Sequence, residues 1–121
     1  MPMPKIFESE YRFCEILWEI EPVRSGELVK LAEERLGWRP TTTYTVIKRL
    51  AERGVLVNEN SVVRSLIGRD EVRVSEIDEL VEKKFSGSVP AFIAAFARSR
   101  TLSEKDADEL KRMIDEMRRS S

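Results

Sequence analysis

Histidine is absent from the 121-residue sequence, and cysteine occurs once, at Cys14. The missing imidazole removes the commonest general base and the commonest neutral metal ligand. A single thiol forms neither an internal disulfide nor the usual zinc site. The sequence also lacks an apolar run of about 18 residues, which a membrane-spanning helix needs, and its N-terminus lacks the apolar core of a secretory signal. These absences argue against an enzyme, a metal or other cofactor, and membrane insertion, and they predict a cytoplasmic protein.

The charges are unevenly distributed, although the net charge is only −1. Residues 1–37 have five basic and eight acidic side chains, residues 38–73 have seven and four, and residues 74–121 have nine and ten. An excess of positive charge favours contact with nucleic-acid phosphates. A difference of this size also arises by chance, so it supports a nucleic-acid site only together with other features.

The pattern of apolar residues predicts three helices, a β-hairpin and three further helices. The predicted helices begin near Ser9, Ser25, Pro40, Ser75, Ser88 and Ser103, with Ser9 and Ser25 as N-cap candidates. Two β-branched stretches, 55–57 and 62–67, are separated by the turn-like sequence NENS and predict the hairpin. This order predicts a mostly α fold, with a winged helix-turn-helix domain over residues 1–73 and a C-terminal helical dimerisation region over residues 74–121.

The third predicted helix lies in the sequence WRPTTTYTVIKRLAERG. At about 100° per residue, one face holds Thr43, Val46, Ile47 and Leu50, the opposite face holds Thr41, Tyr44, Thr45, Lys48 and Glu52, and Thr42, Arg49 and Arg53 lie at the flanks. Threonine is a poor helix former, so helicity alone does not explain these residues. Short hydroxyl side chains near a helix N-terminus suit the floor of a DNA major groove. The alternative is an ordinary solvated helix face.

Three neighbouring features favour DNA recognition over a solvated face: the short turn before this helix, the hairpin after it and the local positive charge. The candidates for reading base edges are Thr41, Thr42, Tyr44, Thr45 and Lys48. The candidates for contacting the phosphate backbone are Ser25, Arg49, Arg53 and Arg64. The partner is then a double-stranded DNA operator.

The sequence resembles the penicillinase repressor family of winged-helix transcriptional regulators. The matching stretches are Ser9–Trp18, Gly37–Leu56 and Gly87–Met117, and the second contains the family pattern at Trp38, Pro40, Thr42, Thr45, Val46, Ile47, Arg49, Leu50 and Gly54. The resemblance implies a homodimer that binds a palindromic operator and represses transcription. The predicted hairpin is shorter than the family's wing and lacks its usual Lys and Gly-Arg.

The resemblance also implies that the C-terminal helices carry the dimer contacts. A helical region of this length has little core of its own, so its apolar residues favour an interface over a monomer core. The candidate interface residues are Leu80, Phe85, Phe92, Ile93, Phe96, Leu110, Met113, Ile114 and Met117.

In antibiotic-responsive members of the family, a membrane sensor protease leads to cleavage of the repressor between Asn and Phe. The matching bond is Ala95–Phe96, where alanine stands in place of the asparagine. The paired cysteines of a copper-responsive branch are absent, so no metal site is expected. The alternative function is a winged-helix protein-interaction module that does not bind DNA.

Overall fold

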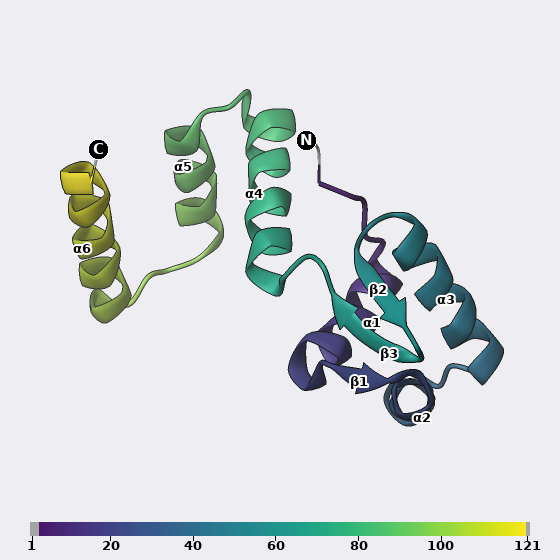
Figure 1. Cartoon of the computed structure of the whole chain (residues 1–121). Coiled ribbons are helices and arrows are strands. Elements are labelled where there is room, and N and C mark those ends of the chain that lie inside the picture. Colours follow the sequence, from purple (N-terminus) through teal and green to yellow (C-terminus); the bar gives the residue numbers. More distant parts are fainter. Residues whose placement is uncertain (1–2, 121) are drawn as a thin grey trace. The chain divides into compact units, whose positions relative to one another are not determined.

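The computed structural model describes residues 3–120, and their contacts form two compact units that divide between Ile77 and Asp78 (Figure 1). The first unit contains α1 (Glu8–Ile20), β1 (Val23–Arg24), α2 (Ser25–Leu36), α3 (Pro40–Glu52), β2 (Leu56–Glu59) and β3 (Val62–Ser65). α4 (Arg69–Phe85) begins in the first unit and ends in the second, which also contains α5 (Val89–Ser99) and α6 (Glu104–Ser120). The predicted mostly α winged-helix fold is confirmed.

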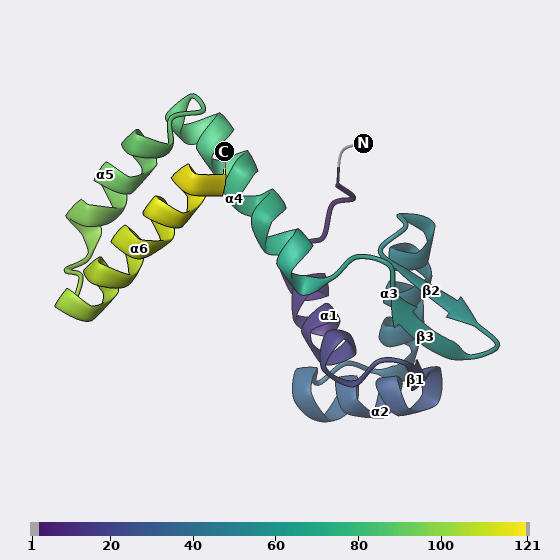
Figure 2. The same ribbon diagram turned by 60° about the vertical axis from the view of Figure 1, so that its left-hand side comes forward.

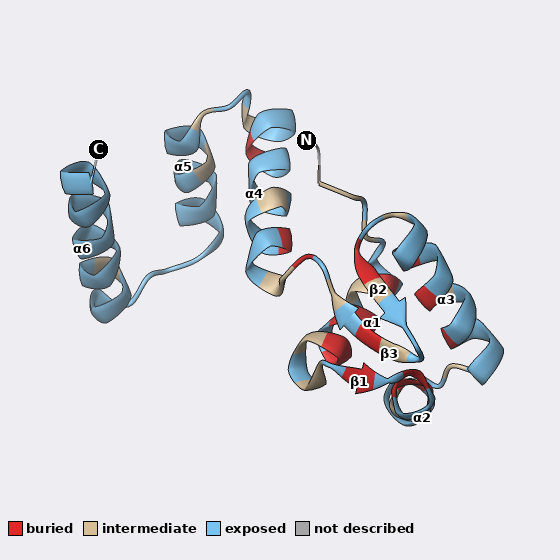
Figure 3. Ribbon diagram, in the orientation of Figure 1, coloured by how far each residue is buried: buried red, intermediate tan, exposed pale blue. Residues whose placement is uncertain are grey.

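The core of the first unit lies among α1, α2, α3 and the sheet (Figure 3). α1 packs on α2 and β3, whereas α3 packs on α2 and β2. The largest fully buried side chains are Phe13, Leu17, Leu28, Leu50, Leu56, Val55, Val63, Thr43 and Cys14. Each large apolar side chain contributes roughly 1.5–3 kcal/mol when it is fully buried. This packing fixes one face of α3 against the unit.

The sheet has three strands in the order β1-β3-β2, one strand more than predicted. β2 and β3 form the expected hairpin, and its two turn residues, Asn60 and Ser61, both have positive φ, as a two-residue type I′ turn requires. The unpredicted strand β1 pairs Val23 with Val63. The backbone N–H of Ser25 also donates to the carbonyl oxygen of Ser61 at 2.8 Å. The hairpin is therefore connected to the start of α2.

Two predicted N-caps and one predicted helix start are wrong. Arg24, and not Ser25, is the N-cap of α2, and it makes no side-chain cap hydrogen bond. α1 begins at Glu8 rather than after a Ser9 cap, because Phe7 occupies the N-cap position and its N–H donates to the Glu10 carboxylate at 2.9 Å. α4 begins at Arg69, well before Ser75, and its first turns join the core through buried Val72.

In the second unit, the predicted helix starts at Ser88 and Ser103 are confirmed. Each hydroxyl accepts a backbone N–H at 3.1 Å, from Ala91 and from Asp106. α5 and α6 lie side by side (Figure 2), and every residue of both helices is at least partly exposed. These two helices therefore present apolar side chains that their own unit does not cover.

Candidate nucleic-acid interface

A tight turn connects α2 to α3. Gly37 ends α2 with φ of 70°, in the left-handed region that glycine adopts without strain. Pro40 then occupies the first turn of α3, where its missing N–H leaves no intrahelical bond unmade. The Trp38 ring stacks on Phe13 with centroids 5.6 Å apart, so this turn is anchored to α1. The result is a helix-turn-helix with α3 as its second helix.

α3 has a buried face and an exposed face, as its helical wheel predicts. Thr43, Ile47 and Leu50 are buried (Figure 3). The five predicted base-reading residues, Thr41, Thr42, Tyr44, Thr45 and Lys48, are all exposed. Four of the five lie in the first half of the helix, the half that a recognition helix presents to base edges. Their contact with DNA stays a prediction.

The hydroxyl groups on α3 differ in what they can still bind. The Thr45 hydroxyl donates to the Thr41 carbonyl oxygen at 2.9 Å, so its methyl group and the two lone pairs of its oxygen are what it offers a partner. Tyr44 is 48% exposed. Within residues 3–120 the buried Thr43 hydroxyl has no hydrogen-bond partner. This hydroxyl faces the core and is not part of the exposed surface.

The four predicted backbone-contacting residues fall into two groups. Arg49 and Arg64 are exposed, Arg64 on β3 of the hairpin with its guanidinium 3.3 Å from the Glu59 carboxylate. Ser25 is only 7% exposed, because it begins α2 underneath the hairpin turn. The guanidinium of Arg53 is bound inside the first unit. Arg49 and Arg64 are therefore accessible to a partner, whereas Ser25 and Arg53 are largely covered, and the contact of all four with DNA stays a prediction.

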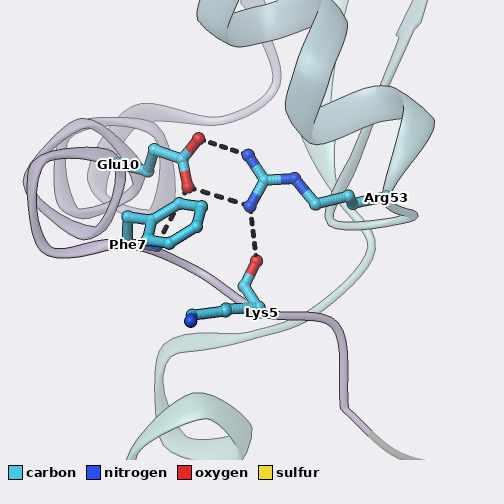
Figure 4. Close-up of polar contacts among 4 residues, drawn as sticks. All are labelled: Lys5, Phe7, Glu10 and Arg53. Carbon is cyan, nitrogen blue, oxygen red and sulfur yellow. Dashed lines mark hydrogen bonds and ion pairs between the residues drawn. The ribbon is translucent and has the colours of Figure 1, made fainter.

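Arg53 binds two parts of the chain that are far away in sequence (Figure 4). Its guanidinium donates to both carboxylate oxygens of Glu10 and, at 2.7 Å, to the Lys5 carbonyl oxygen. Burial raises the pKa of Glu10, but the hydrogen bonds from Arg53 and the Phe7 N–H, with the charges of Arg53 and Arg49, outweigh burial and lower the pKa overall. The hydrogen bond to Glu10 in turn raises the pKa of Arg53.

Sequence reasoning missed Glu10 as a residue of this region. The available signal was local: Glu10 lies three residues after Phe7, the spacing at which a glutamate reaches back to the N-cap N–H. That spacing accounts for one hydrogen bond of the carboxylate and gives no indication of Arg53.

The predicted interface residues of the C-terminal helices are all at least partly exposed. Leu80, Ile93, Phe96, Leu110, Met113, Ile114 and Met117 are between 37% and 69% exposed, and Phe85 and Phe92 are partly covered by each other, with ring centroids 5.6 Å apart. A groove of about 380 Å³ lies between α5 and α6 and includes Phe92, Phe96 and Met113 in its walls. The dimer contact of these residues stays a prediction.

The Ala95–Phe96 bond lies within α5. Proteases preferentially cut exposed, irregular segments, so cleavage at this bond requires local unfolding of the helix.

Residues 3–120 have neither a cluster of metal ligands nor a helix suited to crossing a membrane. They contain no group of three His, Cys, Asp or Glu side chains that could hold a metal ion. None of the helices in this range combines the length and apolar character needed to cross a membrane.

Cys14 is buried, and burial together with the charge of Glu10 raises the pKa of its thiol to about 12.

Comparison with known proteins identifies the family of the chain. A model of the family described as penicillinase repressor matches residues 6–116. The chain is also similar to an uncharacterized 16.5 kDa protein from Latilactobacillus sakei, encoded in the region 3′ of ptsI; the two are 25% identical over 114 residues, which cover 91% of this chain and 78% of the relative. The family match spans the winged helix and nearly all of the C-terminal helices. The chain therefore belongs to the penicillinase repressor family, a family of transcriptional repressors.

Proposed function

We propose that this protein represses transcription by binding, as a homodimer, to a palindromic DNA operator. The observation that carries the proposal is the exposed face of α3, where hydroxyl and basic side chains lie on the second helix of a helix-turn-helix. The family membership supports the proposal, because the family is one of transcriptional repressors.

In the proposed complex the first half of α3 enters the major groove. The hydroxyl groups of Thr41, Thr42 and Tyr44 can donate to or accept from base edges, and threonine methyl groups can contact a thymine methyl. Lys48 lies further along the same face and suits a guanine edge or a phosphate. Arg49 and Arg64 are then placed to contact phosphates, which fix the register of the helix but carry no sequence information.

The homodimer is supported by the apolar side chains that α5 and α6 leave exposed. Ile114 and Met117, for example, are 55% and 69% exposed on α6. Contiguous exposed apolar surface of this kind is typical of protein interfaces. A dimer also raises the effective concentration of the second DNA-binding domain once the first has bound. We expect half-sites about 10 base pairs apart, or a multiple of that spacing.

An electrophoretic mobility shift with the promoter DNA of the protein's own gene tests this function. Lys48→Glu should weaken binding by at least about tenfold, since it replaces an attractive charge with a repulsive one on the exposed face of α3. Lys84→Glu, on α4 of the second unit, is the matched charge control and should change binding little. If Lys48→Glu binds as wild type does, α3 does not read this DNA.

The alternative is a winged-helix module that binds another protein through its exposed apolar residues and does not bind DNA. Genome-wide footprinting of the bound protein separates the two functions. The alternative predicts no protected DNA, whereas the proposed function predicts protected sites with two-fold sequence symmetry.

A further inference from the structure

The N-terminal segment, the first turn of α1 and the C-terminal end of α3 meet at one polar cluster (Figure 4). Its centre is the pair of Glu10 and Arg53, which are 43 residues apart in the sequence. Glu10 accepts the Phe7 N–H at 2.9 Å, and Arg53 donates to the Lys5 carbonyl oxygen at 2.7 Å. The Phe7 ring covers the guanidinium, whose central carbon is 5.4 Å from the ring centroid. The cluster therefore connects three segments through two charged side chains.

The geometry leaves Arg53 poorly suited to hold a phosphate. Its planar guanidinium already makes the two-point contact with a carboxylate that it would otherwise make with a phosphate. The Glu10 side chain is 8% exposed and the Arg53 side chain 27% exposed. Moving Arg53 to DNA would leave a buried carboxylate without its partner, which is strongly unfavourable.

The position of the pair along α3 gives it a different role. The main packing neighbours of α3 are α2 and β2. Glu10 adds a direct connection from α1 to the residue that caps the C-terminal end of α3. A helix that reads base edges must be held within roughly 0.5 Å of its productive position, because hydrogen bonds to bases tolerate little displacement.

We infer that Glu10 and Arg53 are positioning residues that fix the orientation of α3 for DNA reading, and that Arg53 is not a phosphate contact. This inference rests on the proposed function, since it assigns these residues a part in the recognition of the operator.

Glu10→Gln distinguishes a positioning role from a phosphate contact, because the two roles predict opposite changes. If Arg53 is a phosphate ligand that Glu10 restrains, the substitution frees the guanidinium and removes a negative charge. DNA then binds more tightly, and the slope of log K against log[salt] steepens by about 0.9. If the pair positions α3, operator affinity falls by about tenfold, whereas affinity for unrelated duplex DNA and the salt slope stay unchanged.

Arg53→Lys is a second, independent test of the positioning role. A lysine keeps the positive charge, which a phosphate contact largely needs, but it cannot bind both carboxylate oxygens of Glu10 and the Lys5 carbonyl in the same geometry. The positioning role predicts that Arg53→Lys, like Glu10→Gln, lowers the affinity for the operator relative to the affinity for unrelated DNA. It also predicts that the double variant loses no more operator affinity than either single variant does. Additive losses, or a normal Arg53→Lys variant, would overturn the inference.

Glu19→Gln is the matched control. Glu19 also lies on α1 and is also paired with an arginine, Arg35, at 3.2 Å, but both side chains of that pair are largely exposed. The charge change is identical, so a general electrostatic effect on DNA binding appears in both variants. We expect Glu19→Gln to stay within about twofold of wild type, because exposed ion pairs contribute little. Affinities are measured by fluorescence anisotropy on the promoter fragment and on a scrambled duplex over a range of KCl.

A measurement without DNA separates failure of the inference from failure of the proposed function. Amide hydrogen exchange of the full chain should become faster in residues 5–10 and 50–55 together in Glu10→Gln, but not in Glu19→Gln. Exchange that stays at the wild-type rate in both segments would refute the positioning role. If wild type binds no DNA, the proposed function fails, and the inferred role in DNA reading fails with it even where exchange confirms the connection. If Glu10→Gln does not fold, Arg53→Lys is used for both measurements.

Discussion

The buried hydroxyl of Thr43 predicts that Thr43→Val makes the protein more stable. Thr43 is fully buried on α3, and within residues 3–120 its Oγ1 has no hydrogen-bond partner. Valine has nearly the same shape and a similar helix propensity, so the substitution exchanges a hydroxyl for a methyl group without creating a cavity. An unsatisfied buried polar group costs about 1–3 kcal/mol. We therefore expect the free energy of unfolding to rise by about 1–2 kcal/mol.

Urea denaturation followed by circular dichroism measures this change. For a small domain the slope m is about 1–3 kcal/mol/M, so the midpoint should rise by roughly 0.3–2 M while the slope stays unchanged. Thr42→Val is the matched control, since Thr42 is the exposed neighbour on the same helix. The control should stay within about 0.5 kcal/mol of wild type.

In DNA binding the order is reversed, because Thr42→Val should have the larger effect and Thr43→Val should have none. Thr43 faces the core, so Thr43→Val should bind the operator as wild type does, whereas Thr42→Val removes an exposed hydroxyl and should bind more weakly. A Thr43→Val protein that is less stable than wild type by about 1 kcal/mol would refute the reasoning, because it would mean that the buried hydroxyl has a partner.

Three further predictions concern charge, reactivity and assembly. Because the pKa of Glu10 is below its ordinary value of 4.5 in the folded protein, its carboxylate stabilises the fold above that pH and loses this effect as the pH falls through the lower folded value; Glu10→Gln should be about 1–3 kcal/mol less stable than wild type at pH 7, and in urea titrations the difference should shrink as the pH is lowered below 4.5. Cys14 should remain unmodified by a thiol reagent at pH 8 until urea unfolds the protein, because its thiol is buried and its pKa is raised to about 12; labelling of the native protein at the rate of a free thiol would contradict this. Ile114→Asp should weaken the dimer by at least about tenfold in sedimentation equilibrium, because it places a charge in an apolar interface, whereas Lys111→Asp on the same helix should have a smaller effect.

The faces of α3 were predictable because both signals are local. Helical spacing separates Thr43, Ile47 and Leu50 from the exposed residues, and Pro40 and Gly54 mark the two ends of the segment. The caps at Ser88 and Ser103 were predictable for the same reason, since each hydroxyl binds a backbone N–H three residues away.

The elements that sequence reasoning missed depend on distant partners. β1 has two residues, and it is a strand only because Val23 pairs with Val63. α4 begins at Arg69 because Val72 reaches the core of the first unit, whereas Ser75 has the local character of a helix cap without being one. The pairing of Arg53 follows the same rule, because its carboxylate partner Glu10 lies 43 residues away in the sequence. Local sequence patterns do not predict such pairings.

The pairing of basic residues also reduces the positive charge that the first unit has available for DNA. Three arginines of the basic segment 38–73 have a carboxylate nearby: Arg53 with Glu10, Arg64 with Glu59, and Arg73 with Asp70. Lys48 and Arg49 are exposed, and among residues 3–120 neither takes part in an ion pair. Of these three pairs only that of Arg53 is largely buried, since both side chains of the Arg64 and Arg73 pairs are more than half exposed.

The proposed dimer gives a quantitative prediction for the salt dependence of DNA binding. Each phosphate contact contributes a slope of about −0.9 to log K against log[salt], and the second subunit contributes its own contacts at a high effective concentration. Wild type on a full operator should therefore show about twice the slope of Ile114→Asp on a single half-site, in anisotropy titrations over KCl. Equal slopes would mean that the two DNA-binding domains do not engage the operator together, and the exposed apolar face of α6 would then need another explanation.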